Sequence, residues 1–165
     1  MLPALCLLLF SAGDNVFDAV RNNQVAAVKT YLDQHGDPNR RDEKGHPLLI
    51  LAAYNGSLES VDLLLQRGAD PHMQDGMGTA LMAASFKGST QIVRRLLRAG
   101  ARVNDRNGIG ATALMFASLT GRFETAKLLL NYKADAAAVD QRGLDARKLA
   151  EGQGNEPMVR LLTAN

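Results

Sequence analysis

A ten-residue phrase of this sequence returns 33 residues later in nearly the same form. The two copies are TALMAASFKG at residues 79–88 and TALMFASLTG at residues 112–121. Each copy is followed by a second run with helical spacing of apolar residues, at 90–99 and 123–131. Self-similarity at a fixed period is typical of a stack of equal units, in which neighbours bury each other's apolar faces. The sequence therefore predicts a repeat architecture.

Glycine recurs at one position of every unit after the first. The intervals between successive glycines are 32, 33 and 33 residues, and the shorter first interval predicts a loop with one residue fewer around residues 74–78. These glycines are Gly56, Gly88, Gly121 and Gly154. The register divides the chain into five units, of which the outer two are capping units with a polar outer face. Their bounds are about residues 14–41, 42–73, 74–106, 107–139 and 140–165.

The first helix of each unit should begin at a residue that suits a helix start. Thr79 and Thr112 hold this place in the third and fourth units, and a hydroxyl there can accept a hydrogen bond from an unpaired backbone N–H. Pro47 and Asp145 hold it in the second and last units. Two of the second helices end on glycine, but Lys133 stands at that position in the fourth unit. A left-handed backbone at Lys133 should cost roughly 1 kcal/mol.

These units resemble the ankyrin repeat. The sequences LLLQRGAD at residues 63–70 and VRRLLRAGA at residues 93–101 match the second half of that family's consensus, and DEKG at residues 42–45 matches its opening turn. The resemblance covers about residues 15–165. It implies an all-α solenoid of about five helix-turn-helix units joined by β-turn or hairpin fingers. It also implies a non-catalytic module for one protein partner, and we expect a monomer when that partner is absent.

The first 13 residues, MLPALCLLLFSAG, form a separate apolar segment. It is shorter than the about 20 residues that span a bilayer, and it predicts a secretory signal peptide cleaved after Ala12 or Gly13. No Lys or Arg precedes the apolar run, which an upstream start codon would explain. The alternative is an extra apolar helix that covers the first repeat of a cytoplasmic protein. Cleavage would remove Cys6, the only cysteine, which suits an oxidising compartment.

Composition and motifs argue against several function classes. The net charge of +2 is too small to favour nucleic acid or an anionic membrane surface. His35, His46 and His72 lie scattered in turns without metal-ligand spacing, so we expect no metal and no cofactor. Asp42 and Asp75 recur at one repeat position, which indicates a role in turns, because a catalytic pair would be singular and convergent. An enzyme is therefore disfavoured.

Five arginines lie close together in the second helix of the third unit and the turn after it. An acidic partner or a phosphate backbone could bind there. The resemblance places this helix on the outer side of the stack, and Arg94 and Arg98 are four residues apart on its solvated face. We therefore favour a solvated surface without a ligand. The five are Arg94, Arg95, Arg98, Arg102 and Arg106.

Superposition of the units brings three apolar side chains into one row at the ends of the first helices: Tyr54, Phe86 and Leu119. In ankyrin repeats, helix ends and turn tips line a concave groove that binds the partner. An exposed apolar row with polar edges is typical of an interface hot spot. The alternative is that these side chains fold down onto neighbouring repeats. The predicted partner-binding residues are Lys44, His46, Tyr54, Asn55, Met77, Phe86, Lys87, Ile109, Leu119, Thr120 and Arg142.

The predicted function is protein binding along this groove, in the periplasm or outside the cell. The chain is similar to small exported ankyrin-repeat proteins of Gram-negative bacteria, and this resemblance implies an accessory role beside an exported enzyme. The alternative is an immunity protein that neutralises a toxin. A cytosolic scaffold is less favoured. The neighbouring genes would separate the two main alternatives, since an exported enzyme favours the first and a secreted toxin the second.

Overall fold

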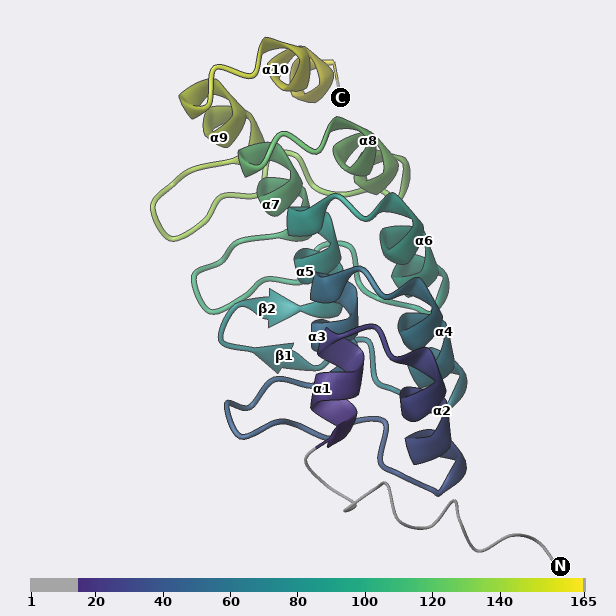
Figure 1. Ribbon diagram of the computed structural model, residues 1–165. Coiled ribbons are helices and arrows are strands. Elements are labelled where there is room, and N and C mark those ends of the chain that lie inside the picture. The colour runs from purple at the N-terminus through teal and green to yellow at the C-terminus, as the bar shows by residue number, and fades with distance from the viewer. Residues whose placement is uncertain (1–14, 165) are drawn as a thin grey trace, which may run out of the picture.

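The computed structural model describes residues 15–164, which form a stack of helix pairs (Figure 1). The segment for which we predicted a signal peptide, residues 1–13, lies outside the described residues. No helix within 15–164 is long and apolar enough to cross a membrane. The elements in chain order are α1 (Asn15–Arg21), α2 (Val25–Asp33), α3 (Leu48–Asn55), α4 (Leu58–Gln66), β1 (Gln74–Asp75), β2 (Gly78–Thr79), α5 (Ala80–Lys87), α6 (Thr90–Arg98), α7 (Ala113–Leu119), α8 (Phe123–Asn131), α9 (Ala146–Gly152) and α10 (Glu156–Thr163).

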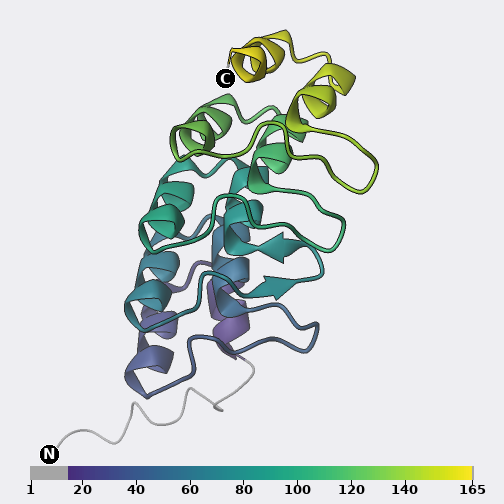
Figure 2. The same cartoon turned by 180° about the vertical axis from the view of Figure 1, so that it is seen from behind.

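The helices stand in two rows, and the loops between pairs project from one side. The first helices of the pairs, α1, α3, α5, α7 and α9, form the inner row. The second helices, α2, α4, α6, α8 and α10, form the outer row (Figures 1 and 2). Each helix packs on its partner and on its counterparts in the adjoining pairs, as α3 does on α4, α1 and α5. This arrangement confirms the predicted all-α solenoid. We call the projecting loops finger 2 (residues 41–47), finger 3 (74–79), finger 4 (106–112) and finger 5 (139–145).

A continuous apolar core runs through the stack. The same repeat positions are buried in successive units, so each pair covers the apolar face of the next. Burial of one such leucine contributes about 1.5–3 kcal/mol, and the alanines allow the helices to approach closely. Recurring fully buried or nearly fully buried residues are Leu49, Leu81 and Leu114 in the inner row, Leu64, Leu96 and Leu129 in the outer row, and Ala52, Ala84 and Ala117.

Side-chain caps begin the inner helices at the predicted residues. Thr79 Oγ1 accepts from the Met82 backbone N–H at 3.4 Å, and Thr112 Oγ1 accepts from that of Met115 at 3.4 Å. Asp145 Oδ1 accepts from Lys148 N at 2.7 Å. These bonds satisfy N–H groups that have no partner inside the helix. Helix α3 begins after Pro47 without a side-chain cap.

Left-handed residues end the helices. Lys133 has φ 65°, where Gly68 and Gly100 have φ 86° and 92°. His35 has φ 63° at the corresponding position of the first unit, a match that our comparison of units missed. Asn23 has φ 55° in the turn where we expected asparagine to tolerate such angles. The repeat thus imposes this conformation on residues for which it is costly.

Candidate functional site

An apolar hollow of about 210 Å³ opens between the inner row and the fingers. Helices α3 and α5 supply most of its wall, α7 contributes one ring, and fingers 2 and 3 close one side. We call this space the hollow, and the wider surface between inner helices and fingers the groove. The lining residues are His46, Ile50, Leu51, Tyr54, Asp75, Met77, Gly78, Thr79, Met82, Ala83, Phe86 and Phe116.

Three aromatic rings from successive inner helices stand beside one another in the hollow. Tyr54 and Phe86 stack with centroids 6.4 Å apart and ring planes 14° apart. Phe86 and Phe116 meet edge to face at 6.3 Å. The Lys87 ammonium lies 4.9 Å from the Tyr54 ring centre, where it is attracted by the negative face of the ring. Tyr54 remains 42% exposed, so the row does not fold down completely onto its neighbours.

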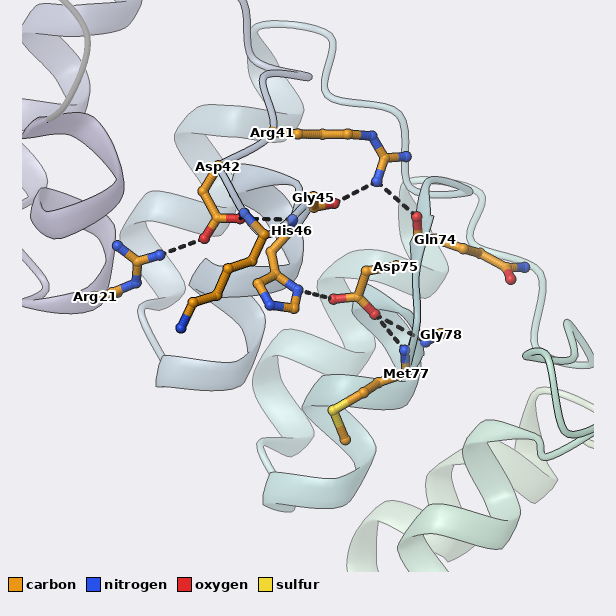
Figure 3. Close-up of polar contacts among 10 residues, drawn as sticks. Arg21, Arg41, Asp42, Gly45, His46, Gln74, Asp75, Met77 and Gly78 are labelled. Carbon is orange, nitrogen blue, oxygen red and sulfur yellow. Dashed lines mark hydrogen bonds and ion pairs between the residues drawn. The ribbon is translucent and has the colours of Figure 1, made fainter.

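Polar contacts between fingers 2 and 3 hold the other side of the hollow (Figure 3). His46 Nδ1 lies 2.6 Å from Asp75 Oδ2, and the other oxygen of Asp75 accepts from the backbone N–H groups of Met77 and Gly78. Arg41 donates to the carbonyls of Gly45 in its own finger and of Gln74 in the next, at 2.7 and 2.9 Å. These bonds fix the spacing of the two fingers.

An aspartate or asparagine folds fingers 2, 4 and 5 by the same pair of hydrogen bonds, as Asp140 does with Arg142 N and Leu144 N. Asp42 Oδ1 accepts from Lys44 N and His46 N at 3.0 and 2.9 Å, and Asn107 Oδ1 accepts from Ile109 N and Ala111 N at 3.2 and 2.9 Å. Such local side-chain bonds favour turns. The recurring carboxylates therefore serve the fingers.

The aspartates that begin the turns of fingers 2 and 5, Asp42 and Asp140, have lowered pKa values. Burial alone would raise the pKa of Asp42, but the N–H groups of His46 and Lys44 and nearby positive charge hold it below its usual value. Burial would also raise the pKa of Asp140. Hydrogen bonds from the Leu144 N–H and the Arg142 side chain outweigh this effect, so the pKa of Asp140 is lowered. Both carboxylates therefore stabilise the turns of their own fingers in the ionised form.

Finger 3 is one residue shorter than its neighbours, and this opens the hollow. Its sequence DGMGT at 75–79 lacks one residue of the finger 4 sequence NGIGAT at 107–112. The missing residue corresponds to His46, Ala111 and Leu144 in the other fingers. Finger 3 instead closes as the β1–β2 hairpin, with Asp75 opposite Gly78. Gly78 has φ 130°, and a Cβ there would clash with the Met82 sulfur.

The predicted binding residues fall into two groups. His46, Tyr54, Met77 and Phe86 line the hollow, and Lys87 lies beside it. The others lie elsewhere along the groove or take structural roles: Asn55 donates to Leu51 O, Thr120 donates to the carbonyls of Phe86 and Phe116, Arg142 pairs with Asp140, and Lys44, Ile109 and Leu119 are exposed.

Several residues of the hollow were missed by the sequence comparison, notably Leu51, Ala83 and Phe116. They occupy one repeat position, three residues before the row of Tyr54, Phe86 and Leu119. Residues three apart on a helix share a face. This spacing, together with the change from Leu to Ala to Phe at one position, is the signal that would have found them.

The five arginines lie away from the hollow. Helix α6 belongs to the outer row, and Arg95 pairs with Asp62 on α4 at 3.3 Å. Arg106 donates to Val139 O at 2.7 Å and so links fingers 4 and 5. These contacts support a solvated and structural role for the cluster.

No group of three or more His, Cys, Asp or Glu side chains that could hold a metal ion occurs within residues 15–164. His46 is bound to Asp75 beside apolar walls, and the finger aspartates accept bonds from their own turns. The arrangement offers a shaped apolar surface with polar edges. Its chemistry suits recognition of a side chain.

Two rows of helices, with fingers and an apolar hollow on the inner face, define a helical-repeat protein of the binding class. The family model described as Ankyrin repeats (3 copies) matches residues 16–107 and 88–165, and the chain belongs to the ankyrin-repeat family. Ankyrin repeats indicate a protein–protein interaction module, and the family is generally non-catalytic.

A mitochondrial disaggregase from Bos taurus is similar to this chain. The two are 30% identical over 132 residues, which cover 78% of this chain and 20% of the relative. The match thus spans about a fifth of the length of that relative.

Proposed function

We propose that this protein binds one partner protein along the groove, with the hollow and the Tyr54–Phe86 pair as the centre of the interface. The observation that carries the proposal is an open apolar hollow whose aromatic walls remain partly exposed. Apolar patches with polar edges on a protein surface mark interaction sites. Aromatic side chains near the centre of an interface commonly contribute most of its binding energy.

The exposed side chains of the groove lie outside the buried core, and core residues such as Ile50 and Met82 form the floor of the hollow. The recurring leucines of the stack are fully buried, whereas Tyr54, Met77 and Leu119 project from the inner row and the fingers. A partner can therefore bury apolar area without rearranging the stack. Each buried Å² of apolar surface favours association by about 25 cal/mol, before the costs of ordering the partners.

We further propose that the module acts in the bacterial periplasm as an accessory to an exported enzyme. The apolar segment at residues 1–10, followed by small residues at 11–13, supports export. Its removal would leave a chain without cysteine, which suits an oxidising compartment. In this role the protein contributes a binding surface, and its partner contributes the chemistry.

Affinity capture with a carboxy-terminally tagged full chain tests both proposals. The bait is recovered from the envelope fraction of the source organism, and its intact mass shows whether residues 1–13 have been removed. We expect the shortened mass and one exported enzyme that co-purifies with it. An uncut bait would overturn the export proposal, and capture of a secreted toxin would replace the accessory role with an immunity role.

A matched pair of variants tests the groove. Tyr54→Ala/Phe86→Ala removes the two stacked rings, and Phe123→Ala/Tyr132→Ala removes two rings that are each 36% exposed at the ends of α8 in the outer row. We expect the first variant to lose the partner and the second to retain it. Equal capture by all three baits would exclude the groove.

A further inference from the structure

We propose that the hollow receives one aromatic side chain from a partner segment rich in acidic residues. This inference rests on the proposed binding function and specifies the chemistry of the segment that the groove recognises. It follows from the volume of the hollow, the side chains of its walls, the local repeat anatomy and the charges around it.

The volume fits one ring. Sites for drug-sized ligands commonly measure about 300–1,000 Å³, and this hollow is smaller, at about 210 Å³. An apolar cavity of about 150 Å³ lined by aliphatic and aromatic side chains binds benzene. A benzene-sized side chain on a peptide is therefore a suitable occupant, and the open side of the hollow admits the attached backbone.

The walls favour an aromatic occupant over an aliphatic one. Phe86 stands between the Tyr54 and Phe116 rings. It stacks on Tyr54 and meets Phe116 edge to face. An additional ring can adopt either geometry, and such aromatic pairs are favourable beyond the apolar area that they bury. Met77 and Met82 add sulfur atoms, which make favourable contacts with ring edges.

The hollow exists because the third unit lacks bulk at two positions. The helix position of Ala83 carries Leu51 in the second unit and Phe116 in the fourth. Finger 3 has no residue at the position before Thr79 that Ala111 occupies in the fourth unit. At these two positions the adjoining units carry Leu51, Phe116 and Ala111, so the third unit has less side-chain volume there than its neighbours.

The charges near the hollow favour an acidic segment. Helices α3, α5 and α7 contain one charged residue, Lys87, and its ammonium lies over the Tyr54 ring. Within the described residues, no carboxylate forms an ion pair with Lys87. Asp75, the carboxylate in the hollow, is already bound to His46 and to its own turn. Glu43 and Lys44 are both exposed at the tip of finger 2, and neither lines the hollow, so the preference for acidic residues rests on Lys87.

Selection from a phage-displayed library of short random peptides tests the inference, with the full chain as target. We expect enriched peptides to carry one Phe, Tyr or Trp flanked by Asp or Glu. Replacement of that aromatic residue by Ala should weaken binding roughly tenfold or more. Replacement of the flanking acids by Gln, or the substitution Lys87→Gln, should weaken binding several-fold and reduce its dependence on salt.

Ala83→Leu closes the hollow with a side chain that the same repeat position already carries as Leu51. It should weaken binding of the enriched peptides roughly tenfold or more, and Ala26→Leu, the same change at an exposed site on α2, should have no effect. A second variant inserts alanine between Gly78 and Thr79, which recreates the finger 4 sequence, and should have the effect of Ala83→Leu. Thermal melting of each variant confirms that it is folded.

The outcomes separate this inference from the proposed function. Peptides that lose binding to Tyr54→Ala/Phe86→Ala but lack an aromatic or acidic pattern, or that bind Ala83→Leu as tightly as the unaltered chain, would overturn the inference and leave groove binding intact. Failure to enrich any peptide would also overturn it, because one anchored segment would then be insufficient. Enriched peptides that bind all variants equally would overturn both.

Discussion

The repeat holds some single residues in backbone conformations that are unfavourable for their residue type. Lys133 ends α8 with φ 65°, a conformation that glycine adopts at the corresponding ends of α4 and α6. Lys133→Gly should stabilise the fold by removing about 1–2 kcal/mol of backbone strain. It should also destabilise the fold by about 0.4–1 kcal/mol, because glycine raises the conformational entropy of the unfolded chain. We expect a small net stabilisation, below about 1.5 kcal/mol, measured by urea unfolding.

The control for this prediction lies in the same element. Lys127 is exposed within α8, and Lys127→Gly should destabilise by roughly 1 kcal/mol because glycine is a poor helix residue. If Lys133→Gly also destabilised the chain, the strain attributed to its left-handed backbone would be wrong.

The finger aspartates make the free energy of unfolding depend on pH in the acidic range. Because the folded state lowers the pKa of Asp42 below its ordinary value of 3.8, its contribution to stability is present above that value and is lost as the pH falls through the lowered folded-state pKa. Asp42→Asn should therefore flatten the fall in the free energy of unfolding below about pH 4. Urea unfolding at a series of pH values measures it.

Finger 4 supplies the reverse experiment. Asn107 folds that finger with the same two hydrogen bonds through a neutral amide, so the amide in Asp42→Asn should preserve the turn. Asn107→Asp should steepen the acid dependence. Identical pH profiles for both variants and the unaltered chain would show that these turns do not distinguish carboxylate from amide.

At the scale of elements, the repeat predicted helices more closely than it predicted the hollow. The register anticipated the caps of α5, α7 and α9 because a threonine or aspartate recurs where each helix begins. It also brought Tyr54, Phe86 and Leu119 into one row. The hollow depends on what is missing, a finger residue before Thr79 and bulk at Ala83, and on the packing of Phe86 between rings from adjoining units. A comparison of positions that are present does not reveal such a space.

The outer helices should tolerate truncation least at their buried positions. Leu96 on α6 is fully buried, so Leu96→Ala should destabilise by about 2–5 kcal/mol through the lost contacts and the cavity left behind. Leu119→Ala, at a position that is 37% exposed on α7, should change stability by much less. Thermal unfolding of the two variants compares them, and similar melting temperatures would refute the assigned difference in burial between the two positions.

The whole molecule is a linear stack whose units contact mainly their neighbours. Stability in such a protein is close to a sum of unit and interface terms, and it resides in the buried positions shared by both rows. The exposed side chains of the groove, such as Tyr54, Met77 and Leu119, contribute little to that sum. Binding and folding should therefore respond to different substitutions, which is what a recognition module on a fixed scaffold requires.

The central claim is that the groove binds the partner, and calorimetric titration of the captured partner tests it most directly. Tyr54→Ala/Phe86→Ala should weaken the affinity by a few kcal/mol, about a hundredfold or more, with the fold retained in circular dichroism. Phe123→Ala/Tyr132→Ala, which removes two rings from the outer row, should bind like the unaltered chain. If both variants bound equally well, or if only the outer variant lost affinity, the partner would not be held by the groove.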